Sequence, residues 1–293
     1  MLEYTQGNFS VRLLKHSITR TGKEAITYLL TYERFIHAEM MTYRQWSRNA
    51  SSSRAIPFER MLNWTSDHPA MPLHLGRNRS GMQSGGVVGN PAHMRKMIHT
   101  LFAVTKSKLE RIVDAHDPHK EIVNRYLEPW GWITVILTTG RDELMHFFHQ
   151  RIDRHANPNI QRLAVNMARL YRRSEPQRLG PLDWHMPFID DHIPHGQVED
   201  VRDDLIWSVA RSAWCSYNNP TKDATFERAK IRHDGCVNDG HMTPCEPQLQ
   251  VTDDETGIVP GYTSYRSMLP GEFTPEFDFS ILDTTYAERD YVV

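Results

Sequence analysis

Residues 43–54 read Tyr43-Arg44-Gln45-Trp46-Ser47-Arg48-Asn49-Ala50-Ser51-Ser52-Ser53-Arg54, a stretch with an unusual density of hydrogen-bond donors. It brings three guanidinium groups and four serine hydroxyls into twelve residues. Arginine forks and hydroxyls match the geometry of phosphate oxygens, so this stretch can clamp the phosphate of a nucleotide. On composition alone, a solvated serine-rich loop with helix caps explains it equally well.

The composition of the whole chain limits the classes of ligand and partner that such a site can bind. It has 293 residues, 39% of them hydrophobic, which is enough for one large domain, 1–293, with its own core. Lys and Arg number 34 against 36 for Asp and Glu, so we expect no nucleic-acid or membrane surface. Three cysteines do not form a disulfide framework, and we see no signal peptide or membrane span. We therefore expect a cytoplasmic protein.

Around the stretch, the spacing of apolar residues predicts both strands and helices. Residues 9–31 alternate around a Thr-Gly turn, which predicts a strand pair. After Pro91, apolar residues recur three and four positions apart, which predicts an amphipathic helix that packs in the core. The same spacing predicts further helices over 121–127, 142–151 and 159–172.

Other segments lack such periodicity. Residues 57–91 are rich in Pro, Gly, Asn and Ser, which predicts a long loop, and loops of this length are often functional. Residues 173–198 predict a connecting strap, after which residues 200–217 return to ordered structure. The acidic and aromatic stretch 252–293 predicts an irregular, partly mobile tail on the surface.

The first stretch resembles the signature of flavin-dependent thymidylate synthases, Arg-His-Arg-x-x-Ser-x-Asn-x-x-Ser-x-Arg-Tyr. The residues in register are Arg44, Ser47, Asn49, Ser52 and Arg54. Thr42 and Tyr43 replace the first Arg and the His of the signature, and Ala55 replaces its closing Tyr. The flanking segments 35–39, 55–57 and 81–83 resemble the phage-type branch of the family.

This resemblance implies roles for individual side chains. Flavin contacts fall to Arg44, Ser47 and Asn49. The nucleotide and its phosphate fall to Glu39, Ser52, Ser53 and Arg54, and Ser52 is also expected to take part in catalysis.

A second match lies in the middle of the chain. Residues 124–130 resemble the family's Arg-x-x-Leu-Pro region, which makes Arg125 part of the phosphate clamp. Residues 144–156 resemble a helix that ends in Arg-x-Asp-x-His-Ala, which places Arg151 beside the pyrimidine ring and His155 near the flavin. A fixed guanidinium can stabilise the enolate charge that develops when C5 of uracil becomes nucleophilic. Without this match, Arg151 would be read as a cation at a helix C-terminus.

A third match comes last in this chain, although the family has it first. Residues 208–217 resemble the family's Ala-Arg-x-Ser strand, and residues 240–247 resemble His-x-Thr-Pro-x-Glu-His. We therefore expect a circularly permuted arrangement. It would bring His241, Thr243 and Glu246 to the flavin, and His241 close to Asn49.

The same segment offers a metal site as an alternative. Cys236, His241 and Cys245 follow a Cys-x4-His-x3-Cys spacing, with Asp239 nearby. A paired Cys-x2-Cys knuckle and a fourth ligand at the usual spacing are missing from the sequence, so we predict no metal.

The resemblance implies an α+β fold with a mixed or antiparallel sheet covered by helices, assembled as a homotetramer. The implied reaction moves a one-carbon unit from methylenetetrahydrofolate to C5 of dUMP, with FAD and NADPH, and gives dTMP. One alternative is a methylase or hydroxymethylase that acts on dCMP or dUMP. Another is a non-catalytic protein that binds nucleotides or nucleic acid, with Trp46 stacking on bases and Arg44, Arg48 and Arg54 on phosphates.

Overall fold

A six-stranded sheet forms the centre of the fold in the computed structural model, which describes residues 2–189, 201–220 and 223–272. Its strands are β1 (Leu2–Gln6), β2 (Phe9–Thr19), β3 (Glu24–Glu33), β4 (Ser47–Ala50), β5 (Trp132–Gly140) and β6 (Gln177–Leu179). They lie in the order β1-β2-β3-β5-β4, and β6 pairs with β2. The β2–β6 pair is parallel and the others are antiparallel, so the prediction of a mixed sheet is confirmed.

The predicted strand pair is β2 and β3. Gly22 adopts a φ of +84° in the turn between them, a conformation that favours glycine. The ladder between β2 and β3 shifts register between Leu13 and Lys15. On its other side, β2 pairs with β1 over its first half and with β6 over its last three residues.

The helices are α1 (His37–Met40), α2 (Phe58–Asp67), α3 (Pro91–His116), α4 (Lys120–Arg125), α5 (Arg141–Arg151), α6 (Pro158–Arg173), α8 (Val201–Trp214), α9 (Phe226–Asn238) and α10 (Tyr265–Met268). Short 3-10 helices are η1 (Arg34–Ile36), η2 (Glu128–Trp130), η3 (Cys215–Tyr217) and η4 (Thr243–Cys245). The predicted helices at 121–127, 142–151 and 159–172 are confirmed as α4, α5 and α6.

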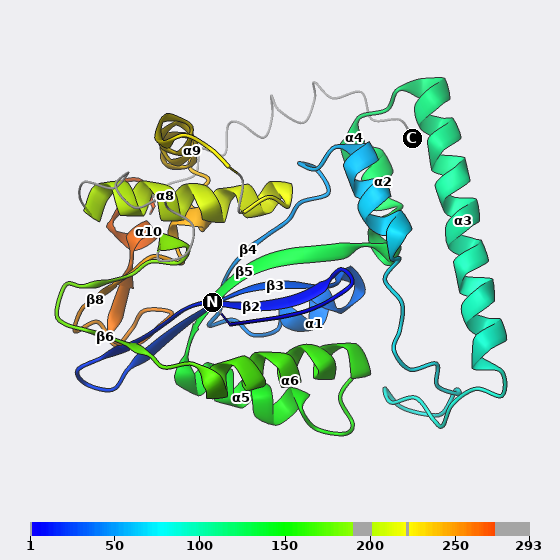
Figure 1. The fold of residues 1–293 in the computed structure, drawn as a ribbon, viewed down its shortest axis with the longest axis horizontal. Coiled ribbons are helices and arrows are strands. Elements are labelled where there is room, and N and C mark those ends of the chain that lie inside the picture. Colours follow the sequence, from blue (N-terminus) through cyan, green and yellow to red (C-terminus); the bar gives the residue numbers. More distant parts are fainter. Residues whose placement is uncertain (1, 190–200, 221–222, 273–293) are drawn as a thin grey trace, which may run out of the picture.

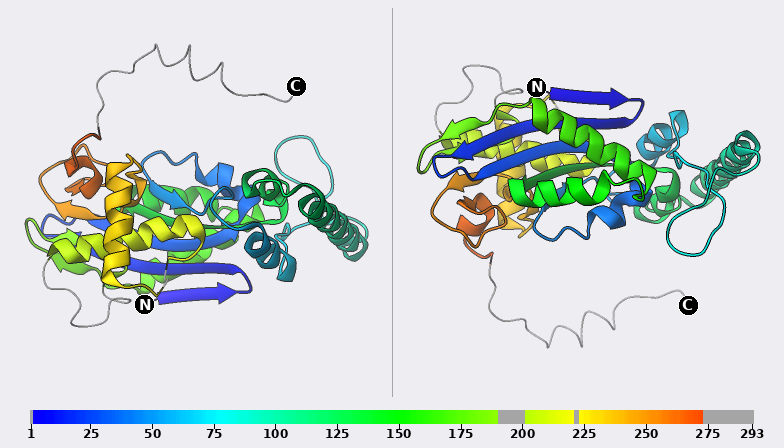
Figure 2. Two further views of the ribbon diagram at one scale, coloured as in Figure 1. Left: turned by 90° about the horizontal axis from the view of Figure 1, so that it is seen from above. Right: turned by 90° about the horizontal axis from the view of Figure 1, so that it is seen from below.

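The two faces of the sheet are covered by different helices (Figures 1 and 2). Tyr28 and Leu30 on β3 belong to the main core, which α5 and α6 close with residues such as Leu163. The neighbouring Leu29 points the other way and packs with Phe188 and Cys215. This alternation follows from the two-residue period of a strand, and it leaves both faces buried.

A small helical cluster stands at one end of the sheet. The predicted loop 57–91 is wrong in its first part, because α2 occupies residues 58–67. Asn90 caps α3 by accepting a hydrogen bond from the backbone N–H of His93, and Pro91 starts the helix. Phe102 and Leu109 of α3 pack in one cluster with Met61 and Leu62 of α2 and with Leu127.

The core role predicted for all of α3 is wrong for one side of the helix. Met94, Met97, Leu101, Val104 and Ile112 are between 39% and 60% exposed. In Figures 1 and 2, α3 lies beyond the end of the sheet. Its apolar residues thus form two neighbouring stripes, and one stripe has no cover within the described chain.

The C-terminal third forms a second, antiparallel sheet of β7 (Trp184–His185), β8 (Leu249–Val251) and β9 (Tyr262–Ser264). The prediction of an irregular tail from 252 is wrong for residues 252–272, which contain β9 and α10. Val259 and Tyr262 are buried against Ala25 and Leu249 because this segment covers the end of the first sheet. Residues 273–293 lie outside the described residues.

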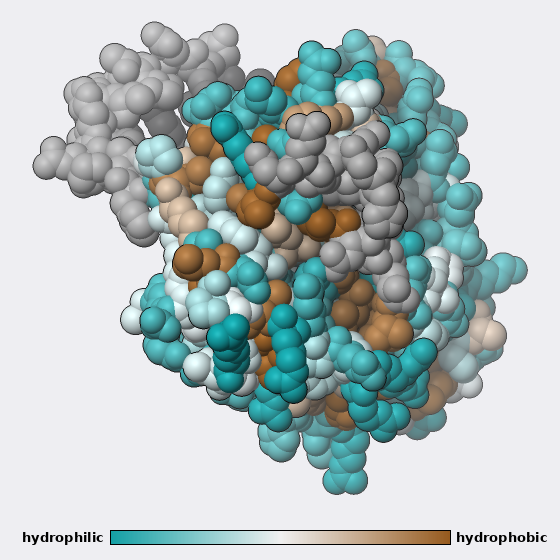
Figure 3. Space-filling view, turned by 60° about the vertical axis from the view of Figure 1, so that its left-hand side comes forward, coloured by the Kyte–Doolittle hydropathy of each residue, from teal (hydrophilic) through white to brown (hydrophobic). Residues whose placement is uncertain are grey.

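The strap predicted over 173–198 contains β6 and β7, and its last residues from 190 lie outside the described part. No helix among the described residues is both long and apolar enough to cross a membrane. On the face shown in Figure 3, hydrophobic side chains lie in small separate areas among hydrophilic ones.

Candidate functional site

The C-terminal third reaches the edge strand β4. The Ser47 hydroxyl on β4 donates to Oε2 of Glu246 at 3.0 Å, across 199 positions of the sequence. Ser47 is buried and Glu246 is half-buried. Burial raises the pKa of the Glu246 carboxyl, and the hydrogen bond from Ser47 acts in the opposite direction.

A cavity of about 360 Å³ joins the same two parts of the chain. Asn49, His241 and Thr243 line it together with Arg232 and Cys236. His241 and Asn49, which were expected to lie close together, thus line the same cavity. The amide of Asn49 is already used inside the protein, because its Nδ2 donates to the carbonyl oxygen of Ser212 at 2.6 Å.

The strand predicted at 208–217 is wrong, because these residues belong to α8 and η3. All positions from Leu205 to Trp214 are buried. A continuous buried run has no period, so it does not by itself distinguish a strand from a buried helix. Asp203 and Asp204 in the first turn favour the helix, because carboxylates stabilise its N-terminus.

The predicted phosphate clamp has its two arginines on one carboxylate. Arg54 Nε lies 2.9 Å from Oε1 of Glu121, and Arg125 Nη2 lies 3.5 Å from the same oxygen. Both arginine side chains are more than half exposed, so an anion can reach them. Glu121 was not predicted from the sequence, although its position four residues before Arg125 is a signal for such a pair.

The two serines of the clamp differ. The Ser52 hydroxyl accepts a hydrogen bond from the backbone N–H of Arg54, and Ser52 is only half-buried. Ser53 is 5% exposed, and its hydroxyl donates to Glu128 at 2.6 Å. This geometry disagrees with the predicted nucleotide contact of Ser53, because its only hydroxyl proton is used inside the protein.

Arg151 is the last residue of α5 and is held on two sides. Its Nε donates to the Tyr43 hydroxyl at 2.7 Å, and its Nη1 lies 3.5 Å from Oε2 of Glu39. The other oxygen of Glu39 accepts from Asn157 at 3.4 Å. Tyr43, which departs from the family signature, is thus a contact of the predicted catalytic arginine that the sequence did not reveal.

Trp46 is 3% exposed and stacks on Tyr43, with 4.7 Å between ring centres. It cannot stack on a nucleic-acid base, which removes the main contact of the nucleic-acid alternative. Arg48 is half-buried and donates to the carbonyl oxygen of Met40. Arg44 is exposed, and the contacts of the described residues include no hydrogen bond or ion pair from its guanidinium.

His155 lines a different cavity, of about 620 Å³, between residues 72–84 and the α5–α6 connection. Its Nδ1 lies 2.9 Å from Oδ1 of Asp153, whose backbone and ring contacts with His155 lower the pKa of that exposed carboxyl. Asn157 lines the same cavity. The cavity therefore lies one side chain away from the Glu39–Arg151 pair.

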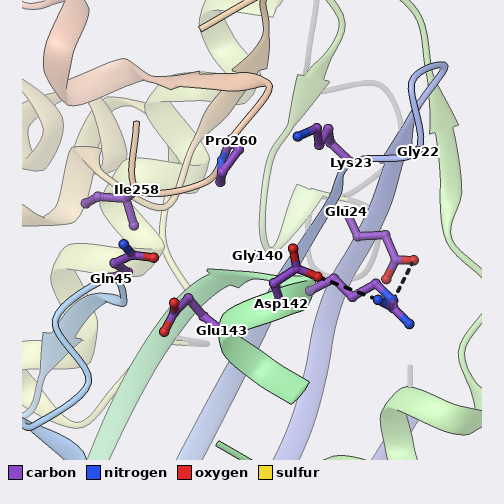
Figure 4. A pocket seen from close by; sticks show the side chains of 10 residues that line it. Gly22, Lys23, Glu24, Gln45, Gly140, Asp142, Glu143, Ile258 and Pro260 are labelled. Carbon is purple, nitrogen blue, oxygen red and sulfur yellow. Dashed lines mark ion pairs between the residues drawn. The ribbon is translucent and has the colours of Figure 1, made fainter. Parts of the chain in front are cut away.

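A third cavity, of about 330 Å³, was not indicated by the sequence (Figure 4). It lies at the start of α5 beside the β2–β3 turn, and none of the predicted site residues line it. Arg141 lies 3.8 Å from Glu24 and 3.6 Å from Asp142, and Lys23 pairs with Glu255 at 2.8 Å. Its basic groups are thus already neutralised.

The zinc alternative lacks a ligand cluster. Within the described ranges, no three His, Cys, Asp or Glu side chains come together in a way that could hold a metal ion. Cys236 and Cys245 are buried and unpaired with each other, and His241 is exposed. Burial raises the pKa of the Cys245 thiol to about 12, which disfavours the thiolate that zinc requires.

No protein-family model and no curated protein matches the chain. Two solved structures of the UMP/dUMP methylase PolB from Streptomyces cacaoi are similar to it. The one bound with 5-Br dUMP has a TM-score of 0.43 and 20% identity, over 51% of this chain and 67% of that chain. The one bound with 5-Br UMP has a TM-score of 0.48 and 17% identity, over 57% and 90%. The function is therefore inferred from the residues of this chain.

Proposed function

We propose that this protein transfers a one-carbon unit from methylenetetrahydrofolate to C5 of dUMP, with FAD and NADPH, and so makes dTMP. The observation that carries the proposal is that residues assigned to one ligand, but far apart in sequence, lie together. Arg54 and Arg125 share Glu121, and Asn49 and His241 line one cavity. If residues 43–54 were only a solvated serine-rich loop, neither pair of residues would be expected to lie together. We also propose that the order of these segments is circularly permuted relative to the family.

In this proposal, the nucleotide is held at both ends. Ser52, Arg54 and Arg125 bind the phosphate through charge-assisted hydrogen bonds. Arg151 lies beside the pyrimidine, where its guanidinium stabilises negative charge on the ring as C5 becomes nucleophilic. Tyr43 and Glu39 fix the guanidinium in advance, so that little reorganisation is needed during the reaction.

The cavity beside Asn49 fits one end of a flavin. Its volume of about 360 Å³ lies in the range of small-molecule sites. Arg232, His241 and Thr243 offer donors for the carbonyl oxygens of a flavin ring, and Glu246 orients Ser47 at the edge of this region. Bound FAD would supply hydride chemistry that the side chains lack.

The proposed assembly is a homotetramer. Among the described residues, the phosphate clamp, the Arg151 cluster and the Asn49 cavity have no residue in common. The uncovered stripe of α3 offers a surface on which a second copy would bring such groups together. An interface between two copies at this stripe would also explain why α3 exposes apolar residues to water in the single chain.

A dCMP methylase or a hydroxymethylase is the second candidate. One observation favours it, because Tyr43 replaces the signature His and contacts Arg151. Because Tyr43 stands in place of that His, Arg151 has a different hydrogen-bond neighbour, and this changes the contacts that its guanidinium can make with the pyrimidine.

The experiment is to purify the protein, record its visible spectrum with FAD, and add NADPH, methylenetetrahydrofolate and either dUMP or dCMP. Mass spectrometry of the nucleotide separates dTMP from cytosine or hydroxymethyl products. We expect Arg151→Gln to lower turnover by about 10²-fold or more, as for loss of a group that stabilises developing charge. Arg172→Gln, at the exposed end of α6, is the matched control. A protein that neither binds FAD nor modifies either nucleotide would contradict the proposal.

A further inference from the structure

The cavity of about 620 Å³ has a basic lining. Its basic side chains are His74, Arg79, Arg154 and His155, and no carboxylate of the described ranges lines it. The rest of the lining is apolar or carries amide and hydroxyl groups: Phe35, Pro72, Met82, Gln83, Ser84, Ala156, Asn157, Pro158 and Asn159. A volume of this size takes a drug-sized ligand, and the side chains favour one with negative charge.

The two arginines of this cavity differ from those of the phosphate clamp and of the cavity beside the β2–β3 turn. Arg54 and Arg125 share a carboxylate, and Arg141 lies near two. The ion pairs of the described residues include neither Arg79 nor Arg154, and both are exposed. Asp153 is the acidic neighbour of Arg154 in sequence, but it does not line the cavity and its Oδ1 is held by His155. The cavity thus has positive charge available for an anion.

Its position indicates which anion it would take. Asn157 lines the cavity and also donates to Glu39, which pairs with Arg151. A ligand here therefore lies beside the proposed reacting group. The nucleotide phosphate already has its own arginines at Arg54 and Arg125. The anionic reactants that remain are the folate co-substrate and NADPH.

We infer that Arg79 and Arg154 bind the glutamyl carboxylates of the folate co-substrate in this cavity. The inference rests on the proposed function. Folate combines a flat ring system with a chain of carboxylates, and the cavity combines arginines with the exposed side chains of Phe35 and Met82. Arginine forks match carboxylates, and exposed apolar side chains at a cavity are typical of a binding surface.

The test is direct binding of tetrahydrofolate to the purified full chain, by calorimetry, with one or three glutamates on the ligand. We expect the triglutamate to bind more tightly, with an advantage that falls as salt rises. Arg79→Gln and Arg154→Gln should each weaken triglutamate binding by about tenfold, the usual scale for one charge-assisted hydrogen bond. Arg77→Gln is the matched control, because Arg77 lies in the same loop and does not line the cavity. Thermal melting confirms that each variant folds.

Two outcomes would overturn the inference. In one, the two cavity variants bind triglutamate as tightly as wild type. In the other, they lose affinity for NADPH, dUMP or inorganic phosphate instead, which would make the cavity a phosphate site. Binding is measured without turnover, so the two proposals fail separately. If the wild type makes dTMP and both cavity variants bind folate as tightly as the wild type, this inference alone is overturned. A chain that makes no product but binds triglutamate through Arg79 and Arg154 overturns the proposed reaction alone.

Discussion

Glu121 controls the charge of the proposed phosphate clamp. Its carboxylate contacts both Arg54 and Arg125, and it competes with any anion for these guanidinium groups. The pairs are exposed, so they contribute at most about 1 kcal/mol each to stability. We expect Glu121→Gln to leave the fold intact and to raise the affinity for dUMP by roughly fivefold, the equivalent of about 1 kcal/mol.

Calorimetric titration with dUMP and with deoxyuridine measures this effect, since only the nucleotide carries the phosphate. Glu59→Gln, an exposed substitution on α2, serves as the control. Weaker binding of dUMP by Glu121→Gln would show instead that the carboxylate holds the two guanidinium groups in their binding orientation.

His37 makes stability depend on pH. The Tyr32 hydroxyl and Nδ1 of His37 share a hydrogen bond of 2.8 Å, and burial, aided by Arg34 and Arg48, lowers the pKa of His37 to about 4. The unfolded chain has a histidine pKa near 6.5 and binds the proton more tightly. The stability that neutral His37 provides is therefore complete above about pH 6.5 and is lost as the pH falls towards 4.

We expect the melting temperature of the wild type to fall across this window. His37→Gln keeps an acceptor for Tyr32 but has no titrating group, so its melting temperature should fall less steeply. Differential scanning calorimetry at a series of pH values measures both slopes. The slope should not vanish, because burial also lowers the pKa of His16 and His185. Identical slopes would mean that His37 is not protonated on unfolding in this range.

Helix α3 carries its apolar residues on two stripes. Phe102 and Leu109 pack with residues of α2, while Met94, Met97, Leu101 and Val104 are exposed three and four positions apart. Such spacing on a helix of 26 residues suits pairing with another helix. A second copy of the same chain presents the same stripe, so a two-fold axis brings two stripes together.

We therefore expect the purified protein to self-associate and Leu101→Glu to shift it to a smaller species in analytical ultracentrifugation. Ala103→Glu places the same charge on the exposed polar side of α3, and it should sediment as the wild type does. A wild-type protein that remains monomeric at micromolar concentration would contradict the expected assembly.

The elements that the sequence predicted best are those whose burial follows a simple period. In α6, Ile160, Leu163, Ala164 and Met167 recur on one side and are buried against the sheet. The failures have a common cause. In α8 nearly every position is buried, so no period remains, and in α3 the period is clear but does not reveal which stripe the chain covers.

At the scale of the whole molecule, the sequence motifs identified the arginines and Asn49 of the candidate site. They did not identify the residues that these side chains contact. Tyr43 contacts Arg151, and Glu121 contacts Arg54, across long distances in sequence, and no local pattern announces those two contacts. Only the pair of Glu121 with Arg125 follows a local helical spacing. The sequence did not indicate the basic cavity, for a related reason. Arg79 lies in an aperiodic segment, and its meeting with Arg154 depends on how that segment folds over the α5–α6 connection.

Because Ser47 and Glu246 are far apart in sequence, the contact between β4 and the C-terminal part of the chain forms late during synthesis. The strands of the first sheet up to β5 leave the ribosome before α8 and η4, and N-terminal parts of a chain begin to fold first. Until residues 201–246 arrive, the edge strand β4 lacks the packing of η3 and η4 against it, and an uncovered edge is the kind that recruits foreign strands. Its length of only four residues limits that hazard for the growing chain.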